Sequence, residues 1–134
     1  MSPRVRLVLN ASSGVLYARP RGRLTPELML APLAEVYRRS GANAFRLILW
    51  DLGGLSHDLD YSDLRLLTTR IAQVVVEWQL DARLAIVADT PLRFGISRQF
   101  QALLPEDIGI EVEVFSEVDQ AREYLETPER RLRG

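Results

Sequence analysis

Cysteine and lysine are both absent from this chain of 134 residues, and histidine occurs once. Without cysteine the chain has no disulfide, no thiol nucleophile and no thiolate metal ligand. No apolar stretch is long enough to cross a bilayer, and the first residues lack the apolar segment of a signal peptide. Together these absences predict a cytoplasmic protein without a membrane span.

The composition is that of an ordinary soluble globular domain, with 47% hydrophobic and 26% charged residues. The length predicts one domain over residues 1–126, followed by a charged, loose tail over residues 127–134. The net charge of −1 argues against dedicated nucleic-acid binding.

All 17 strongly basic residues are arginines, and several of them precede the first acidic residue, Glu27. Arg19, Arg21 and Arg23 could hold a carboxylate or a phosphate, because the guanidinium group is always charged and offers a planar fork of donors. The alternative, which we favour, is a solvated strand face that keeps a sheet edge soluble.

Five short apolar segments have the length and composition of strands. They are Val5–Leu9, Val15–Ala18, Arg46–Trp50, Leu84–Ala88 and Ile110–Val114. Turn residues between the first two predict a hairpin, and Pro20 and Gly22 should end the second strand or make it bulge. The third and fourth are continuous apolar runs typical of buried strands, whereas the last alternates as a strand near the sheet edge does.

Four segments carry apolar residues at helical spacing. Their expected starts are Thr25-Pro26, Asp60, Thr90-Pro91 and Ser116. The apolar stripes predict that Leu28, Tyr61 and Leu92 are buried at the beginning of the first three helices. The resulting order is β-β-α-β-α-β-α-β-α, which predicts an α/β fold with a mixed sheet: an N-terminal hairpin and otherwise mainly parallel strands, covered by helices.

The chain is organised around the strand, turn and helix of residues 45–67. Asp51, Gly53 and Gly54 follow the strand directly, at the end where open α/β sheets usually place their sites. The glycine pair could let the backbone approach a phosphate, but its spacing matches neither the Walker A loop nor GxGxxG. We therefore expect no cofactor, and we favour a tight turn with positive φ.

His57 lies beside Asp58 and near Asp51 and Asp60, and a neutral imidazole among carboxylates could bind a divalent metal or act as a general base. Catalysis needs converging groups, however, and the sequence has no recognisable nucleophile motif and no helical zinc spacing. A polar turn with helix-capping aspartates explains these residues more simply, so we predict neither an enzyme nor a metal site.

Several segments, in their order and spacing, resemble the STAS superfamily, the domain of sulfate transporters and anti-sigma-factor antagonists. The segments are Arg21–Thr25, Leu47–Leu55, Ala85–Asp89, and Phe115–Ala121 with Leu125. The resemblance covers roughly residues 14–125 and is closer to the SpoIIAA-like branch of small free-standing bacterial proteins. It implies a SpoIIAA-like fold and a regulatory role through a protein partner, such as an anti-sigma-factor-like or kinase-like regulator.

In anti-sigma-factor antagonists a serine at the start of the helix after this loop is phosphorylated by the partner kinase. The resemblance puts Ser62 closest to that phosphoacceptor. Two neighbouring residues differ from the family pattern: Tyr61 replaces a small residue, and Asp63 occupies a position where glycine is expected. A carboxylate at position 63 would repel a phosphate, and Ser62 is then simply a residue of the first helical turn.

We thus predict a non-catalytic regulatory or interaction module that binds a protein partner through the loop at residues 53–63 and the helix start. The residues of this surface are Asp51, Gly53, Gly54, Ser56, His57, Asp58, Asp60, Ser62 and Asp63. The alternative is a carrier of a small hydrophobic or lipid-like ligand, with an apolar cavity between sheet and helices. Aromatic residues of the expected core would line it, namely Trp50, Trp78, Phe94 and Phe100. A homodimer remains open.

Overall fold

The computed structural model describes residues 5–127, and the tail prediction for residues 128–134 falls outside them. The strands are β1 (Val5–Leu9), β2 (Val15–Pro20), β3 (Leu47–Asp51), β4 (Ala82–Val87) and β5 (Ile110–Phe115). The helices are α1 (Pro26–Ser40), α2 (Tyr61–Glu77), α3 (Pro91–Leu103) and α4 (Val118–Leu125). Short 3₁₀ turns occupy Ala42–Phe45 and Leu52–Gly54. The predicted element order is confirmed.

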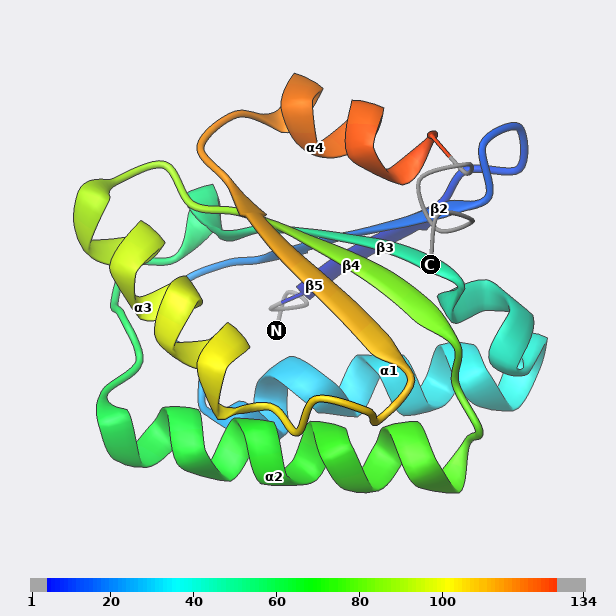
Figure 1. The fold of residues 1–134 in the computed structure, drawn as a ribbon, viewed down its shortest axis with the longest axis horizontal. Coiled ribbons are helices and arrows are strands. Elements are labelled where there is room, and N and C mark those ends of the chain that lie inside the picture. Colours follow the sequence, from blue (N-terminus) through cyan, green and yellow to red (C-terminus); the bar gives the residue numbers. More distant parts are fainter. Residues whose placement is uncertain (1–4, 128–134) are drawn as a thin grey trace.

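One mixed sheet forms the centre of the described part of the chain, with strand order β1-β2-β3-β4-β5. β1 pairs with β2 antiparallel, and the other neighbouring pairs are parallel. Figure 1 shows α1, α2 and α3 on one side of the sheet and α4 on the other. The predicted α/β class with its N-terminal hairpin is therefore confirmed.

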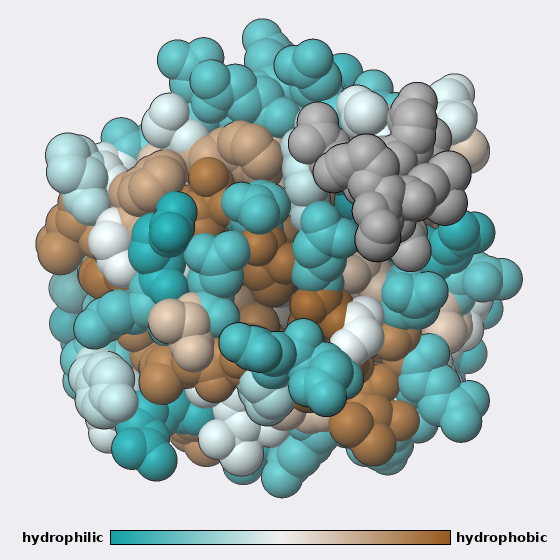
Figure 2. Space-filling model, in the orientation of Figure 1, coloured by the Kyte–Doolittle hydropathy of each residue, from teal (hydrophilic) through white to brown (hydrophobic). Residues whose placement is uncertain are grey.

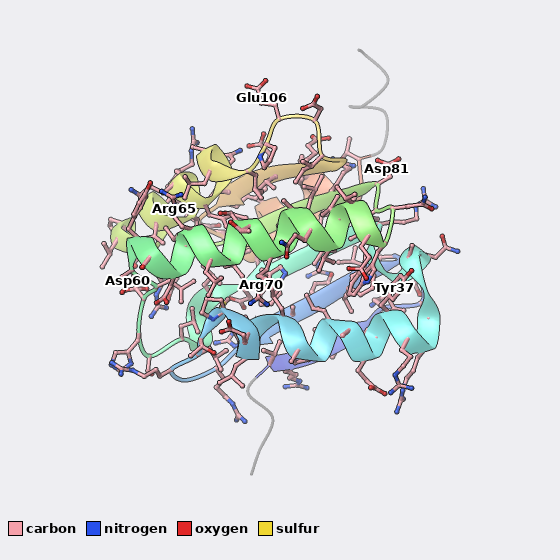
Figure 3. The ribbon with its side chains drawn as sticks, turned by 90° about the horizontal axis from the view of Figure 1, so that it is seen from below. Tyr37, Asp60, Arg65, Arg70, Asp81 and Glu106 are labelled. Carbon is pink, nitrogen blue, oxygen red and sulfur yellow. The ribbon has the colours of Figure 1, made fainter. Side chains whose placement is uncertain are left out.

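The two sheet faces carry cores of unequal size. The larger core lies between the sheet and α1–α3 and includes Phe45 together with Trp50 and Phe100, of which the last two are buried as predicted. Trp78 stacks on Tyr37 with ring centres 4.1 Å apart, at the junction of α1 and α2 that Figure 3 displays. Phe94 is only half-buried. The smaller core lies beneath α4.

Three of the four predicted helix starts are capped as expected. Thr25, Asp60 and Thr90 each accept a backbone N–H from three residues further on. The Ser116 prediction is wrong: Glu117 is the N-cap of α4 and its side chain makes no capping bond. The helix begins one residue later than the Ser–Asp spacing indicates, so Ser116 lies outside the capping position.

The predicted burial of Leu28, Tyr61 and Leu92 is also wrong, since these side chains are between 45% and 63% exposed. Each lies in the first turn of its helix. For α2 and α3, Figure 1 shows that turn at the edge of the molecule rather than over the sheet. The helical period alone therefore identifies which face of each helix is buried. It does not identify the residue at which the helix begins to pack against the sheet.

Candidate functional site

The predicted surface lies at the carboxyl end of β3, on the edge of the molecule where α2 and α3 begin (Figure 1). Asp51 is the last residue of β3, and the 3₁₀ turn Leu52–Gly54 follows it directly. The chain then passes through residues 55–59 to Asp60, the N-cap of α2. All of the predicted partner-binding residues therefore belong to one continuous segment of the chain. It consists of Asp51 and of residues 53–63, which we call the 53–63 loop.

The prediction of positive φ at the glycine pair is wrong, because neither Gly53 nor Gly54 adopts it. Gly54 is required for a different reason: a Cβ there would lie 2.7 Å from the carbonyl oxygen of Pro20. This close approach lets Gly22 donate to the Gly54 carbonyl and accept from Ser56 N–H, each over 3.0 Å. Two backbone hydrogen bonds thus fasten the loop to the segment after β2.

Asp51 uses both carboxylate oxygens inside the molecule. Oδ1 accepts the N–H of Gly53 over 2.9 Å, and Oδ2 accepts from the Arg19 guanidinium over 2.8 Å. The structure therefore brings Arg19, one of the three predicted anion-binding arginines, to a carboxylate of this chain. Arg21 and Arg23 lie after β2 and are exposed.

Arg93, in the first turn of α3, is the residue that the sequence reasoning missed. Its side chain is only 13% exposed. Nε donates to Asp58 over 2.8 Å, and Nη1 donates to the Leu52 carbonyl and to Asp89 over 2.9 and 3.2 Å. Nη2 donates to the Leu55 carbonyl over 2.5 Å. Arg93 thus connects the 53–63 loop and its preceding turn to α3.

The charge of Arg93 is well stabilised. Partial burial lowers the pKa of the guanidinium, but hydrogen bonds and attraction from Asp58 and Asp89 outweigh burial and raise the pKa above its ordinary value. A cation in the first turn of a helix opposes the helix dipole, so it needs a carboxylate nearby. Arg93 four residues after Asp89 was the sequence signal that could have indicated this contact.

Ser56 and His57 lie at the exposed outer part of the loop. The Ser56 hydroxyl is 3.1 Å from His57 Nδ1. Within residues 5–127, no group of three or more histidine, aspartate and glutamate side chains is arranged to hold a metal ion. The neighbouring Asp58 carboxylate binds Arg93.

At the start of α2, Tyr61 and Ser62 are exposed, and the Asp63 N–H is occupied by Asp60 over 2.8 Å. The Arg65 guanidinium lies 6.0 Å from the centre of the Tyr61 ring. Figure 3 shows Asp60 at the beginning of α2 and Arg65 further along the same helix. Ser62 thus occupies the second position of an exposed first turn with carboxylates on both sides of it in sequence.

An apolar cavity of about 80 Å³ lies beneath this loop, between the sheet and helices α1, α2 and α3. Trp50, Leu59, Leu67 and Phe100 contribute to its wall, and Asp58 and Arg93 stand among its lining residues. Its size is well below the roughly 300 Å³ at which pockets for small-molecule ligands begin. As formed, it would admit only a ligand of a few heavy atoms.

Comparison of the sequence with protein-family models gives no match, and a search of curated proteins also gives none. A search of solved structures finds an uncharacterized protein of the DUF3478 family with a SpoIIAA-like fold, from Shewanella loihica PV-4. The two chains are 18% identical, with a TM-score of 0.57, and the match covers 90% of this chain and 91% of the other.

The fold class now agrees with the resemblance found in the sequence. This chain has a SpoIIAA-like fold, as predicted. At 18% identity the likeness shows the fold alone, and the matched protein is itself uncharacterized. Within the described residues, none of the helices combines the length and the apolar character needed to span a membrane.

Proposed function

We propose that this chain is a non-catalytic regulatory module that binds a protein partner through the 53–63 loop and the first turn of α2. The observation that carries the proposal is the anchoring of an exposed loop on both of its sides. Arg93 binds two carbonyl groups and one carboxylate of residues 52–58, and Gly22 binds the backbone at residues 54 and 56. A surface whose backbone is already ordered loses less entropy when a partner binds.

The side chains on this surface are suited to protein recognition. Tyr61 is exposed beside Arg65, and tyrosine and arginine are enriched among the residues that dominate binding energy at interfaces. Ser56, His57 and Asp60 add exposed hydrogen-bonding groups on the adjacent loop. An anti-sigma-factor-like or kinase-like regulator is the kind of partner that the SpoIIAA-like resemblance implies.

The contacts of the polar groups support a binding role rather than catalysis. Asp51 and Asp58 each bind an arginine, so neither is available as a general base. The Ser56–His57 contact is exposed, and among the described contacts of His57 there is no carboxylate to orient the imidazole.

The decisive experiment is capture of a partner with immobilised wild-type protein, identification by mass spectrometry, and calorimetry with the purified partner. Tyr61→Ala and His57→Ala should each weaken binding by about tenfold or more if these side chains form the contact. Arg122→Ala, on the exposed side of α4, is the matched control and should bind like the wild type. Equal affinity of the Tyr61, His57 and control variants would contradict the proposal.

Phosphorylation of Ser62 is a separate test of the same surface. Ser62 is exposed in the first turn of α2, where the helix dipole favours a phosphate, whereas Asp60 and Asp63 disfavour it. Intact-mass analysis after incubation with the partner, if that partner is a kinase, would show one added phosphate. The Ser62→Ala variant should then gain none, and an unmodified wild-type mass would exclude this mode of regulation.

A second candidate function is carriage of a small apolar ligand, and the cavity beneath the loop is the observation in its favour. At about 80 Å³ it is smaller than the roughly 150 Å³ of an engineered cavity that binds benzene. A lipid-like ligand would therefore require residues 52–59 to move away from α3. Native mass spectrometry of gently purified protein tests this function: a bound mass supports it, and a ligand-free mass in every preparation contradicts it.

A further inference from the structure

A second exposed groove lies on the other face of the sheet, beside α4, and does not involve the 53–63 loop. We call it the β1–α4 groove, and it is lined by Arg6, Val8, Tyr17, Ala18, Arg19, Leu49, Asp51 and Val118. Its volume is about 270 Å³. That is close to the lower limit of ligand pockets and leaves room for one or two side chains of a partner.

The groove exists because α4 is too short to cover the whole sheet face. This helix has 8 residues and packs mainly against β3, β4 and β5. Arg6 and Val8 of β1 point to the α4 face, whereas Val5 and Leu7 pack into the larger core on the other face. Val8 is consequently 48% exposed, and Val118 at the start of α4 is exposed beside it. The floor of the groove is therefore apolar and accessible.

The charged side of the groove is positive. Arg6 lies directly opposite Arg19 in the β1–β2 pair, an arrangement that is unfavourable between like charges. Arg19 is neutralised by Asp51 at 2.8 Å, but Arg6 forms no ion pair with any of residues 5–127. An external carboxylate on Arg6 would neutralise the remaining charge with a charge-assisted hydrogen bond.

We propose that the β1–α4 groove is a docking surface for an acidic segment of a protein partner. A carboxylate of the segment binds Arg6, and a neighbouring apolar side chain packs on Val8, Tyr17 and Val118. Residues two apart on a strand are about 7 Å apart, which sets the spacing between the acidic and apolar groups. The apolar floor beside one cation favours such a segment over inorganic anions, which would leave that floor in water. The two surfaces meet at Asp51, whose carboxylate is held by Arg19 and by the Gly53 N–H. The proposal differs from the proposed function because its contacts are made by Arg6, Val8, Tyr17 and Val118, none of which belongs to the 53–63 loop.

The test is a titration of the ¹⁵N-labelled full chain, followed by amide chemical shifts, with defined peptides. The probe is an acetylated, amidated pentapeptide, serine-glutamate-serine-leucine-serine, which we call the glutamate–leucine peptide; its glutamate and leucine are two residues apart and share one face of an extended chain. Two matched peptides replace glutamate by lysine or leucine by serine. The glutamate–leucine peptide should shift amides of β1, β2 and residue 118, and the other two should bind at least about tenfold more weakly.

Two variants and two controls complete the experiment. Arg6→Gln and Val8→Ser should each weaken binding of the glutamate–leucine peptide by about tenfold. Arg122→Ala on α4 and Tyr61→Ala on α2 should leave it unchanged, so failure here is distinguishable from failure of the 53–63 loop. Because both altered groove residues are exposed, thermal midpoints near that of the wild type are expected. Absence of shifts in β1 at millimolar peptide, equal binding of the lysine peptide, or preference for anionic lipid vesicles would overturn the proposal.

Discussion

The Arg93 side chain joins segments that are more than thirty residues apart. Leu52, Leu55 and Asp58 belong to the chain between β3 and α2, whereas Asp89 follows β4. One guanidinium group therefore fixes the position of the loop relative to α3. Because its donors bind carbonyl and carboxylate oxygens, removing the group leaves several partly buried acceptors without a partner.

Replacement of Arg93 by methionine should destabilise the protein and release the loop. Methionine retains part of the aliphatic volume but donates no hydrogen bond, so we expect a loss of about 2 kcal/mol in the free energy of unfolding. Urea unfolding measures this loss, and hydrogen exchange should accelerate at residues 52–58 more than in α4. Arg98→Met on the exposed side of the same helix is the control. Equal stability of the two variants would show that Arg93 does not anchor the loop.

Arg83 and Tyr124 form a second long-range contact at residue scale, beneath α4. Arg83 is 3% exposed and donates to the carbonyl groups of Tyr124, Leu125 and Thr127 at the end of this helix. Its guanidinium carbon lies 4.3 Å from the centre of the Tyr124 ring. The Tyr124 hydroxyl donates to Glu111 over 2.8 Å. Burial first, and then the hydrogen bond to Glu111, raise the pKa of Tyr124 well above its ordinary value.

This raised pKa predicts a loss of stability in alkaline solution. The folded state retains the Tyr124 proton where the unfolded chain, with a tyrosine pKa of about 10, releases it. The stabilisation is therefore complete below pH 10 and decreases as the pH rises above that value. In Tyr124→Phe the free energy of unfolding should fall less steeply above pH 10 than in the wild type. Urea unfolding at a series of pH values measures both slopes, and identical slopes would contradict the assignment.

At the scale of elements, local signals in the sequence were sufficient to predict the order of helices and strands. The Thr-Pro pairs and Asp60 marked three helix starts, and the apolar runs marked β3 and β4 to within one or two residues. The internal contacts of the loop could not be predicted this way. Glycine is required at position 54 because the Pro20 carbonyl group lies close to it, and Asp58 accepts a hydrogen bond from Arg93. In both cases the partner lies more than thirty residues away in sequence. Such contacts depend on strand order, which short-range patterns do not contain.

Two glycine-to-alanine substitutions should have opposite effects. In Gly54→Ala the new Cβ meets the Pro20 carbonyl oxygen at 2.7 Å, so the backbone must shift and stability should fall by about 1–3 kcal/mol. In Gly95→Ala, inside α3, no atom lies within 4 Å of the new Cβ. Alanine there should raise stability by about 0.5–1 kcal/mol, because it restricts the unfolded chain and favours the helix. Thermal or urea unfolding checks both signs, and destabilisation by Gly95→Ala would refute this account of the two sites.

For the whole molecule, the unequal cover of the two sheet faces determines how stability is distributed. Among residues 5–127, α1, α2 and α3 protect one face, whereas α4 is the only helix on the other (Figure 1). Figure 2 shows hydrophilic side chains on the outward surface of α4 and apolar side chains gathered below it. β4 has strands on both sides and all six of its residues are buried, while β1 at the sheet edge carries exposed Val8 and Leu9.

This asymmetry predicts two classes of amide exchange. Amides of β3 and β4 should exchange only when the whole protein unfolds, because both neighbouring strands must separate first. Amides of β1 should exchange through local opening at a lower free energy, since this strand pairs on one side only and forms the exposed part of the β1–α4 groove. Native-state hydrogen exchange at increasing urea measures both classes: the β4 free energies should equal that of global unfolding, and those of β1 should lie below it with little dependence on urea. If β1 followed the β4 values throughout, the edge strand would belong to the central cooperative unit, and the groove would be a rigid surface rather than one bordered by a locally opening strand.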